Sequence, residues 1–162
     1  MHRSTRLAFC LLALSAPALF AADNATVTAS ARIYKPITLA LTNGGLSFGD
    51  IFTDPTGGTV TLDPAGVRST SGPVLATTGS AYAAAFAVTG KRNATYAITL
   101  PASASLAGPG APMTVNGFQT SAAGTLDGSG NQAFTLGATL AIGANQTDGD
   151  YSGTFSVSVA YN

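Results

Sequence analysis

The sequence has 162 residues and a formal net charge of zero, and charged residues make up only 9% of it, against roughly 25% in an ordinary soluble domain. It contains one histidine, one cysteine and no tryptophan. This composition excludes a disulfide framework and a basic surface for nucleic acid, so nucleic acid is not an expected partner.

The first 21 residues predict a secretory signal peptide. Two arginines precede an apolar run from Leu7 to Leu14, and small residues follow at Ala21 and Ala22. The run is too short to span a membrane. A lipoprotein anchor at Cys10 is the alternative, but the phenylalanine before it does not fit that pattern. We expect residues 1–21 to be removed and the protein to be secreted.

Removal of this segment takes away both His2 and Cys10, and it leaves five basic residues against seven aspartates, a net charge of −2. Catalytic sets built on histidine or cysteine are then excluded, as are histidine and thiolate metal sites. A small hydrolase with two catalytic aspartates is the remaining alternative for an enzyme. Each aspartate lies beside residues typical of turns, so we expect no enzyme, no cofactor and no metal site.

The mature chain begins with an alternating segment. Between residues 25 and 33, Val27, Ala29, Ala31 and Ile33 fall on one face and polar side chains fall on the other. This pattern predicts a strand. Pro36 follows and separates the segment from the next expected strand, which gives the segment room to swing away.

The body of the chain predicts further strands separated by Gly, Pro, Asn and Asp. They are expected at residues 37–42, 46–49, 59–62, 82–88, 96–100, 113–120 and 134–142. We expect 82–88 and 96–100 to form a hairpin, 101–112 to be a linker, and 64–78 to be a loop with at most one short strand near Val67.

Two stretches of the body admit alternatives. The alanine-rich residues 80–87 are compatible with a helix, but Tyr82, Phe86 and Val88 favour a strand. Residues 127–131 have the spacing of oxygen ligands in a calcium loop, but the loop glycine and the final glutamate are missing. A hairpin turn is the prediction there.

The cleanest amphipathic strand is predicted at residues 151–162. Phe155, Val157, Val159 and Tyr161 share one face, and serines and Ala160 share the other. Since the alternation continues to the last residue, its free edge should meet an earlier strand or another molecule. Strands with one apolar face each predict an all-β, two-layer sandwich.

These features together resemble one family of bacterial surface proteins. The signal peptide, the alternating residues 25–33, the stretches 36–39 and 46–49, and a terminal strand ending in Tyr-Asn resemble pilins of the chaperone–usher pathway. Within these, the chain is most similar to archaic-type subunits related to spore-coat-U-like proteins and to a pilin-like group described only as a domain of unknown function. Once residues 1–21 are removed, no cysteine remains for the disulfide that many such subunits carry.

The resemblance implies an immunoglobulin-like β-sandwich that lacks its last strand. The gap is expected to be filled first by a periplasmic chaperone and then by the N-terminal extension of the next subunit. Residues 22–35 would be that extension, residues 36–162 the sandwich, and the donor strand would present Val27, Ala29, Ala31 and Ile33. The acceptor groove and chaperone-pairing strand would comprise Phe155, Val157, Val159, Tyr161 and Asn162, with the carboxylate of Asn162 held by basic residues of the chaperone.

The partners implied are identical or related pilin subunits, the chaperone and an outer-membrane usher. The protein would pass through the periplasm to the cell surface and form a fimbria that supports adhesion or biofilm formation. Two alternatives stay open at this point. Residues 25–33 could be the first strand of the chain's own sandwich, or the chain could be a secreted carbohydrate-binding or adhesin module, against which the lack of tryptophan argues.

Overall fold

The computed structural model describes residues 23–52, 55–72, 74–75 and 79–162, so the expected signal peptide lies outside the described residues. Residues 1–32 and residues 33–162 form separate units. The described part of the first unit, residues 23–32, is exposed throughout and carries no strand. The strand expected from its alternation is therefore not paired with any of the described strands. We call residues 33–162 the sandwich unit.

The sandwich unit is all-β and built from antiparallel sheets, and its described residues contain no helix. No described segment is thus a helix that could cross a membrane. The strands are β1 Thr38–Leu41, β2 Ile51–Phe52, β3 Gly58–Leu62, β4 Arg68–Ser71, β5 Val74–Leu75, β6 Ala84–Thr89, β7 Tyr96–Thr99, β8 Ser103–Leu106, β9 Met113–Thr120, β10 Asn131–Ile142 and β11 Ser158–Tyr161.

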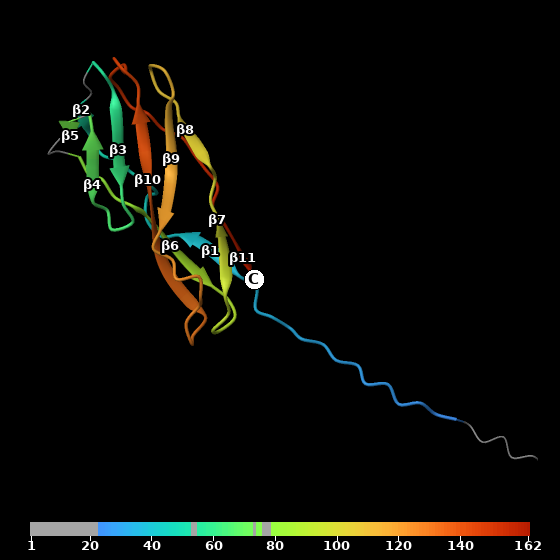
Figure 1. Ribbon diagram of the computed structural model, residues 1–162. Helices are drawn as coiled ribbons and strands as arrows, with labels where there is room; N and C mark the ends of the chain where they lie inside the picture. The colour runs from blue at the N-terminus through green and yellow to red at the C-terminus, as the bar shows by residue number, and fades with distance from the viewer. Residues whose placement is uncertain (1–22, 53–54, 73, 76–78) are drawn as a thin grey trace, which may run out of the picture. The chain divides into compact units, whose positions relative to one another are not determined.

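The main sheet is organised around β10. Its strand order is β1-β6-β10-β3-β4, with β9 on β10 and β8 on β9, and β10 is the long central strand in Figure 1. The first half of β10 pairs β6, with Phe134 opposite Phe86, and the second half pairs β3, with Leu140 opposite Val60. Gly137 lies where the two halves meet, and a Cβ atom there would collide with the carbonyl oxygen of Leu62.

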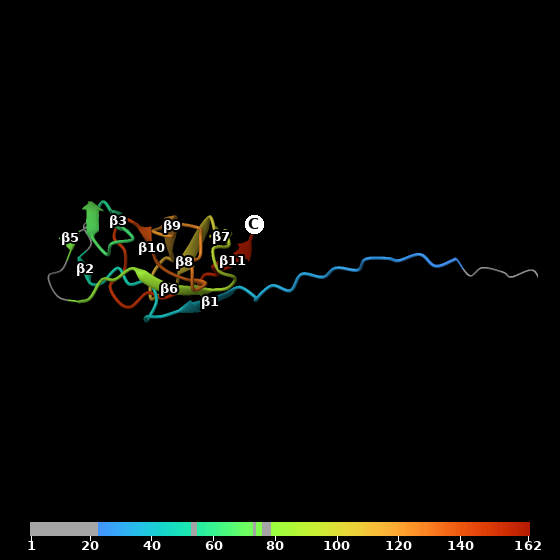
Figure 2. The ribbon, with the colours of Figure 1, turned by 90° about the horizontal axis from the view of Figure 1, so that it is seen from below.

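A second layer is formed by β7, β11 and the residues that lead into β11. β11 pairs β7, and an isolated bridge joins Ser152 to Ala107 just after β8. β1 and β6 lie on one side of the sandwich unit and β7 and β11 on the other (Figure 2). Residues 151–161 therefore run along the layer opposite β1 and β6.

The core between the layers consists of two clusters of buried apolar side chains. One cluster surrounds Val60, Leu62 and Leu140, and the other surrounds Val88 and Leu136. The rings of Phe86 and Phe134 stack at 5.1 Å within the second cluster. No described side chain has a buried polar atom without a hydrogen-bond partner.

The structure corrects the predicted hairpin at residues 82–100. β6 pairs β1 and β10, whereas β7 pairs β11, so these two strands lie in different layers. The turn at residues 90–93 connects the layers, and Asn93 adopts a positive φ of 54° within it. Alternation showed that both segments are strands, but it carries no information on which neighbour each strand pairs with.

Other boundaries also differ from the prediction. The stretch expected as loop, residues 64–78, contains both β4 and β5, and the expected linker 101–112 contains β8. Residues 46–49 contribute only a bridge from Ser47 to Tyr82. The terminal strand is shorter than expected, since only Ser158–Tyr161 is paired as a strand. The described residues 80–87 contain no helix.

Candidate strand-binding groove

The first strand leaves one edge of the main sheet unpaired. β1 pairs β6 through the register Leu39 to Val88 and Leu41 to Phe86, and no other described strand pairs with β1. Thr42 donates its N–H to the carbonyl of Ala85 at 2.8 Å. This hydrogen bond shows which residues of β1 direct their backbone groups toward β6. In an antiparallel ladder the inward-bonded residues alternate, so the N–H and C=O groups of Leu39 and Leu41 point to the open edge.

A groove lies beside this open edge. We call it the edge groove, and its volume is about 1070 Å³. Leu39 and Leu41 of β1 form one wall, and residues 151–157 form the opposite wall. Its floor is apolar and comes from both core clusters. The floor residues are Phe48, Phe86, Met113, Val115, Leu140 and Ile142.

The length of the floor follows from the register of β10. Phe86 lies opposite Phe134, and Ile142 lies eight residues further along β10. At about 3.3 Å per residue these positions are about 26 Å apart. The floor thus accommodates an extended segment of about nine residues.

The C-terminal wall is held against the sandwich by its aromatic side chain. The rings of Phe118 on β9 and Phe155 lie 4.9 Å apart at 48°. Gly153 approaches β8 so closely that a Cβ atom would collide with the carbonyl oxygen of Ser105. Residues 153–157 are nevertheless not paired as a strand, so both walls of the edge groove offer backbone groups to an added strand.

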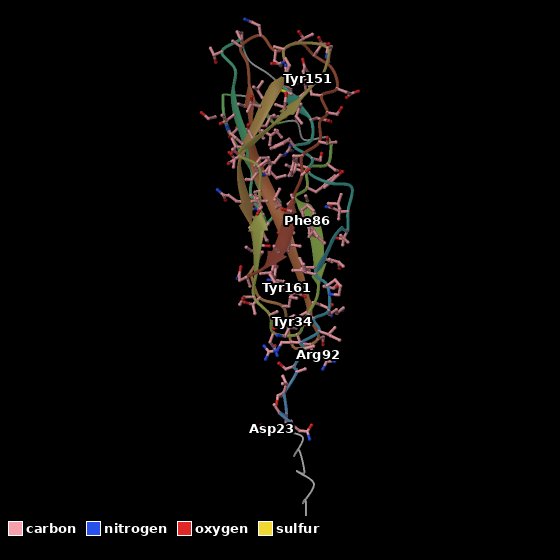
Figure 3. The ribbon with its side chains drawn as sticks, turned by 90° about the vertical axis from the view of Figure 1, so that its right-hand side faces the viewer. Asp23, Tyr34, Phe86, Arg92, Tyr151 and Tyr161 are labelled. Atoms are coloured by element: carbon pink, nitrogen blue, oxygen red, sulfur yellow. The ribbon has the colours of Figure 1, made fainter. Side chains whose placement is uncertain are left out.

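One end of the edge groove is fixed by Tyr151. Its hydroxyl group donates to the carbonyl oxygen of Thr147 at 2.8 Å and accepts hydrogen bonds from the N–H of Gly110 and from Nε2 of Gln146. A tyrosine that bonds to backbone a few residues upstream at this kind of corner is typical of immunoglobulin-like sandwiches. Figure 3 shows Tyr151 near one end of the sandwich unit, with Phe86 near the middle.

The opposite end of the sandwich unit holds Tyr161. Its hydroxyl group donates to the carbonyl oxygen of Lys35 at 2.8 Å and accepts from the N–H of Lys91 at 2.6 Å. The ammonium group of Lys91 lies 4.3 Å from the centre of the Tyr34 ring. Figure 3 shows Tyr34, Tyr161 and Arg92 together at this end. We call Tyr34, Lys35, Lys91 and Tyr161 the linker cluster.

The structure divides the predicted groove residues into two groups. Phe155 and Val157 line the edge groove. Val159 and Tyr161 belong to β11 and pack on the core, while Tyr161 and Asn162 line a separate cavity of about 390 Å³. The predicted alternation is confirmed, because all four apolar side chains are partly buried and the residues between them are exposed.

The predicted donor residues are all exposed. Val27 exposes 85% and Ile33 95% of their surface, and Ala29 and Ala31 are likewise exposed. Sequence reasoning did not identify Leu39, Leu41 or the floor residues as parts of a site. The sequence shows the alternation of these residues, but it does not show that no described strand pairs with the outer edge of β1.

No three His, Cys, Asp or Glu side chains gather among the described residues. Two titratable groups among the described residues have shifted pKa values, and both lie outside the edge groove. Burial raises the pKa of Tyr96, and N–H groups of Asn131 and Ser129 lower the pKa of Asp127. The edge groove itself is suited to holding an extended, alternating peptide.

The comparison with protein families decides the membership of the chain. A family model described as "Domain of unknown function (DUF4402)" matches residues 39–161. The chain belongs to the DUF4402 family. The region shared with DUF4402 runs from Leu39 on β1 to Tyr161 on β11, so it includes both walls and the floor of the edge groove. No curated protein and no solved structure matched the chain.

Proposed function

We propose that this protein is a structural subunit of a bacterial surface fimbria, polymerised when residues 25–33 of one copy insert as a strand into the edge groove of another. The observation that carries the proposal is that one chain contains both an open groove with an apolar floor and an exposed segment whose apolar side chains alternate. The chain would be exported through the periplasm with the help of a chaperone and an outer-membrane usher.

The lengths of the segment and the floor support this occupant. Residues 25–33 span about 26 Å when extended, which equals the distance derived for the floor. A strand in the groove would place one side-chain face on the floor and the other toward solvent. The apolar face of residues 25–33 meets the first requirement and its Thr, Ser and Arg side chains meet the second.

The energetics also favour insertion. Burying Val27 and Ile33 would stabilise the assembly by about 1.5 to 3 kcal/mol each. The backbone groups of Leu39 and Leu41 could accept or donate up to four ladder hydrogen bonds, each worth about 0.5 to 1.5 kcal/mol net. Ala29 and Ala31 contribute less apolar area, so Val27 and Ile33 would act as the anchors.

The same edge would serve the chaperone before assembly. A chaperone strand in the edge groove would cover the floor and pair with β1, and basic chaperone residues would hold the carboxylate of Asn162, which lies at the surface. The finished filament would support adhesion or biofilm formation.

A pair of charge substitutions tests the proposal. Ile33→Asp should abolish polymerisation and leave the sandwich unit folded, because an unpaired carboxylate on the apolar floor is strongly unfavourable. Ser30→Asp carries the same charge on the opposite face and should polymerise nearly as the parent does. Filament yield by electron microscopy and the unfolding midpoint are measured for both variants. Normal polymerisation of Ile33→Asp, or loss of its folded sandwich, contradicts the proposal.

A further inference from the structure

We propose that the linker cluster directs residues 25–33 away from the chain's own edge groove and so favours insertion into another copy. This inference rests on the proposed function, and it assigns a specificity-determining role to Tyr161 and Lys91. Neither residue lines the edge groove.

Self-insertion would need a sharp reversal of the chain. Residue 33 ends the alternating segment and residue 38 begins β1. To lie on the open edge of β1 in the same chain, the segment would have to turn back within residues 34–37. A loop of four residues can join two antiparallel strands, so chain length alone does not prevent self-insertion.

The linker cluster holds the residues that would have to turn. The carbonyl oxygen of Lys35 is bonded to the hydroxyl group of Tyr161, and the ring of Tyr34 lies under the ammonium group of Lys91. These contacts place residues 34 and 35 beside the end of β11 and the turn that follows β6. A reversal toward β1 would change the backbone direction at both residues and break both contacts.

Insertion into another copy leaves the same contacts intact. A donor segment that enters the groove of another copy needs no turn within its own residues 34–37. The cluster therefore acts against one of two competing pairings, which is how many interfaces acquire specificity. The Tyr161 hydroxyl is central to this, since it also accepts the N–H of Lys91 at 2.6 Å and so joins three segments of the chain.

The test compares Tyr161→Phe with the parent chain. Both are studied as the mature protein, at concentrations below and above the concentration at which the parent polymerises. Amide exchange of Leu39 and Leu41 by NMR reports whether the open edge of β1 is covered. In the dilute parent these amides should exchange freely. In Tyr161→Phe they should show protection that does not depend on concentration, with a self-insertion constant raised about five-fold, as expected for one neutral hydrogen bond, and a lower filament yield.

A second substitution keeps the test valid if Tyr161→Phe folds poorly. Lys91 is exposed, so Lys91→Ala should leave the fold intact and raise self-insertion by several-fold through loss of the contact with Tyr34. Lys91→Arg retains a cation over the ring and should behave as the parent. Tyr82→Phe removes an exposed hydroxyl group from elsewhere on the sandwich unit and serves as the matched control.

The outcomes separate this inference from the proposed function. If a peptide of residues 23–36 protects Leu39 and Leu41, but Tyr161→Phe and Lys91→Ala match the parent in monomer protection and filament yield, the role of the linker cluster is wrong while the groove stands. If that peptide protects these amides in none of the proteins, both the groove and the inference built on it are overturned.

Discussion

The ring of Phe155 packs against the ring of Phe118 at a distance of 4.9 Å and an angle of 48°. This contact joins the C-terminal wall of the edge groove to β9, although residues 153–157 have no strand pairing of their own. This aromatic pair therefore contributes to holding the wall through side-chain packing.

Phe155→Ala should consequently destabilise the protein by about 2 kcal/mol, less than the 3 to 5 kcal/mol typical of a fully buried phenylalanine, because Phe155 is only partly buried. Urea unfolding measures the change. Ser156→Ala alters the neighbouring, exposed side chain and should stay within about 0.5 kcal/mol of the parent. Equal effects of the two substitutions would show that the wall is not held by Phe155.

A charge introduced on one face of β1 should weaken peptide binding, and a charge on the other face should not. Leu41 lines the edge groove and is 51% exposed, so Leu41→Asp should leave the protein folded while weakening binding of a peptide of residues 23–36 at least ten-fold. The matched change is Ala40→Asp, on the exposed opposite face, and it should bind the peptide nearly as the parent does. Fluorescence titration with a labelled peptide measures both. Similar affinities for the two variants would place the peptide elsewhere.

Tyr151→Phe should destabilise the corner at one end of the groove. The substitution removes the hydroxyl group that bonds to Gly110, Gln146 and Thr147, and the expected loss is about 1 to 3 kcal/mol. Thermal and urea unfolding measure it, with Tyr82→Phe as the control. A loss below about 0.5 kcal/mol would mean that water replaces these hydrogen bonds without penalty.

The turn at residues 127–131 should contribute a pH-dependent part of the stability. The Asp127 carboxylate accepts N–H groups of Asn131 and Ser129 at 2.9 and 2.8 Å, which lowers its pKa below the usual 3.8. A lowered folded-state pKa stabilises the protein above pH 3.8, and this stabilisation is lost as the pH falls through the folded-state pKa. Proton uptake on unfolding should therefore decrease in Asp127→Asn.

Unfolding midpoints between pH 6 and pH 2 check this prediction. Ser129→Ala keeps the carboxylate and both N–H donors, so it should retain the acid dependence of the parent. An unchanged acid dependence in Asp127→Asn would show that Asp127 titrates alike in the folded and unfolded chains.

The sequence predicted the long strands well because alternation over many residues specifies both a strand and its buried face. Residues 113–120 were predicted as a strand and form β9 with the same bounds. The alternating apolar positions predicted for β10 all lie in the core, and they are Phe134, Leu136, Ala138, Leu140 and Ile142. The short strands β5 and β8 were missed, and β4 was allowed for only as one short strand near Val67. Ser, Gly and Pro dominate these stretches, and the strands depend on their neighbours for pairing.

The candidate site was less accessible to sequence reasoning. Alternation shows which face of β1 is apolar, but it does not show that the edge beyond Leu39 and Leu41 is open. The contact between Tyr161 and Lys35 joins residues 126 positions apart, and no local pattern predicts such a contact. That residues 25–33 donate a strand and that the edge groove accepts it are predictions for the peptide-binding and polymerisation experiments to test.

The most direct test of the groove is the amide exchange of β1 in the Ile33→Asp variant, whose own segment should not insert. A peptide of residues 23–36 is added, and exchange at Leu39, Ala40 and Leu41 is followed by NMR. Protection should rise at Leu39 and Leu41, whose N–H groups face the open edge, and stay unchanged at Ala40, which already pairs with Ala87. Unchanged exchange at Leu39 and Leu41, or the same protection with a peptide of scrambled sequence, would contradict the account.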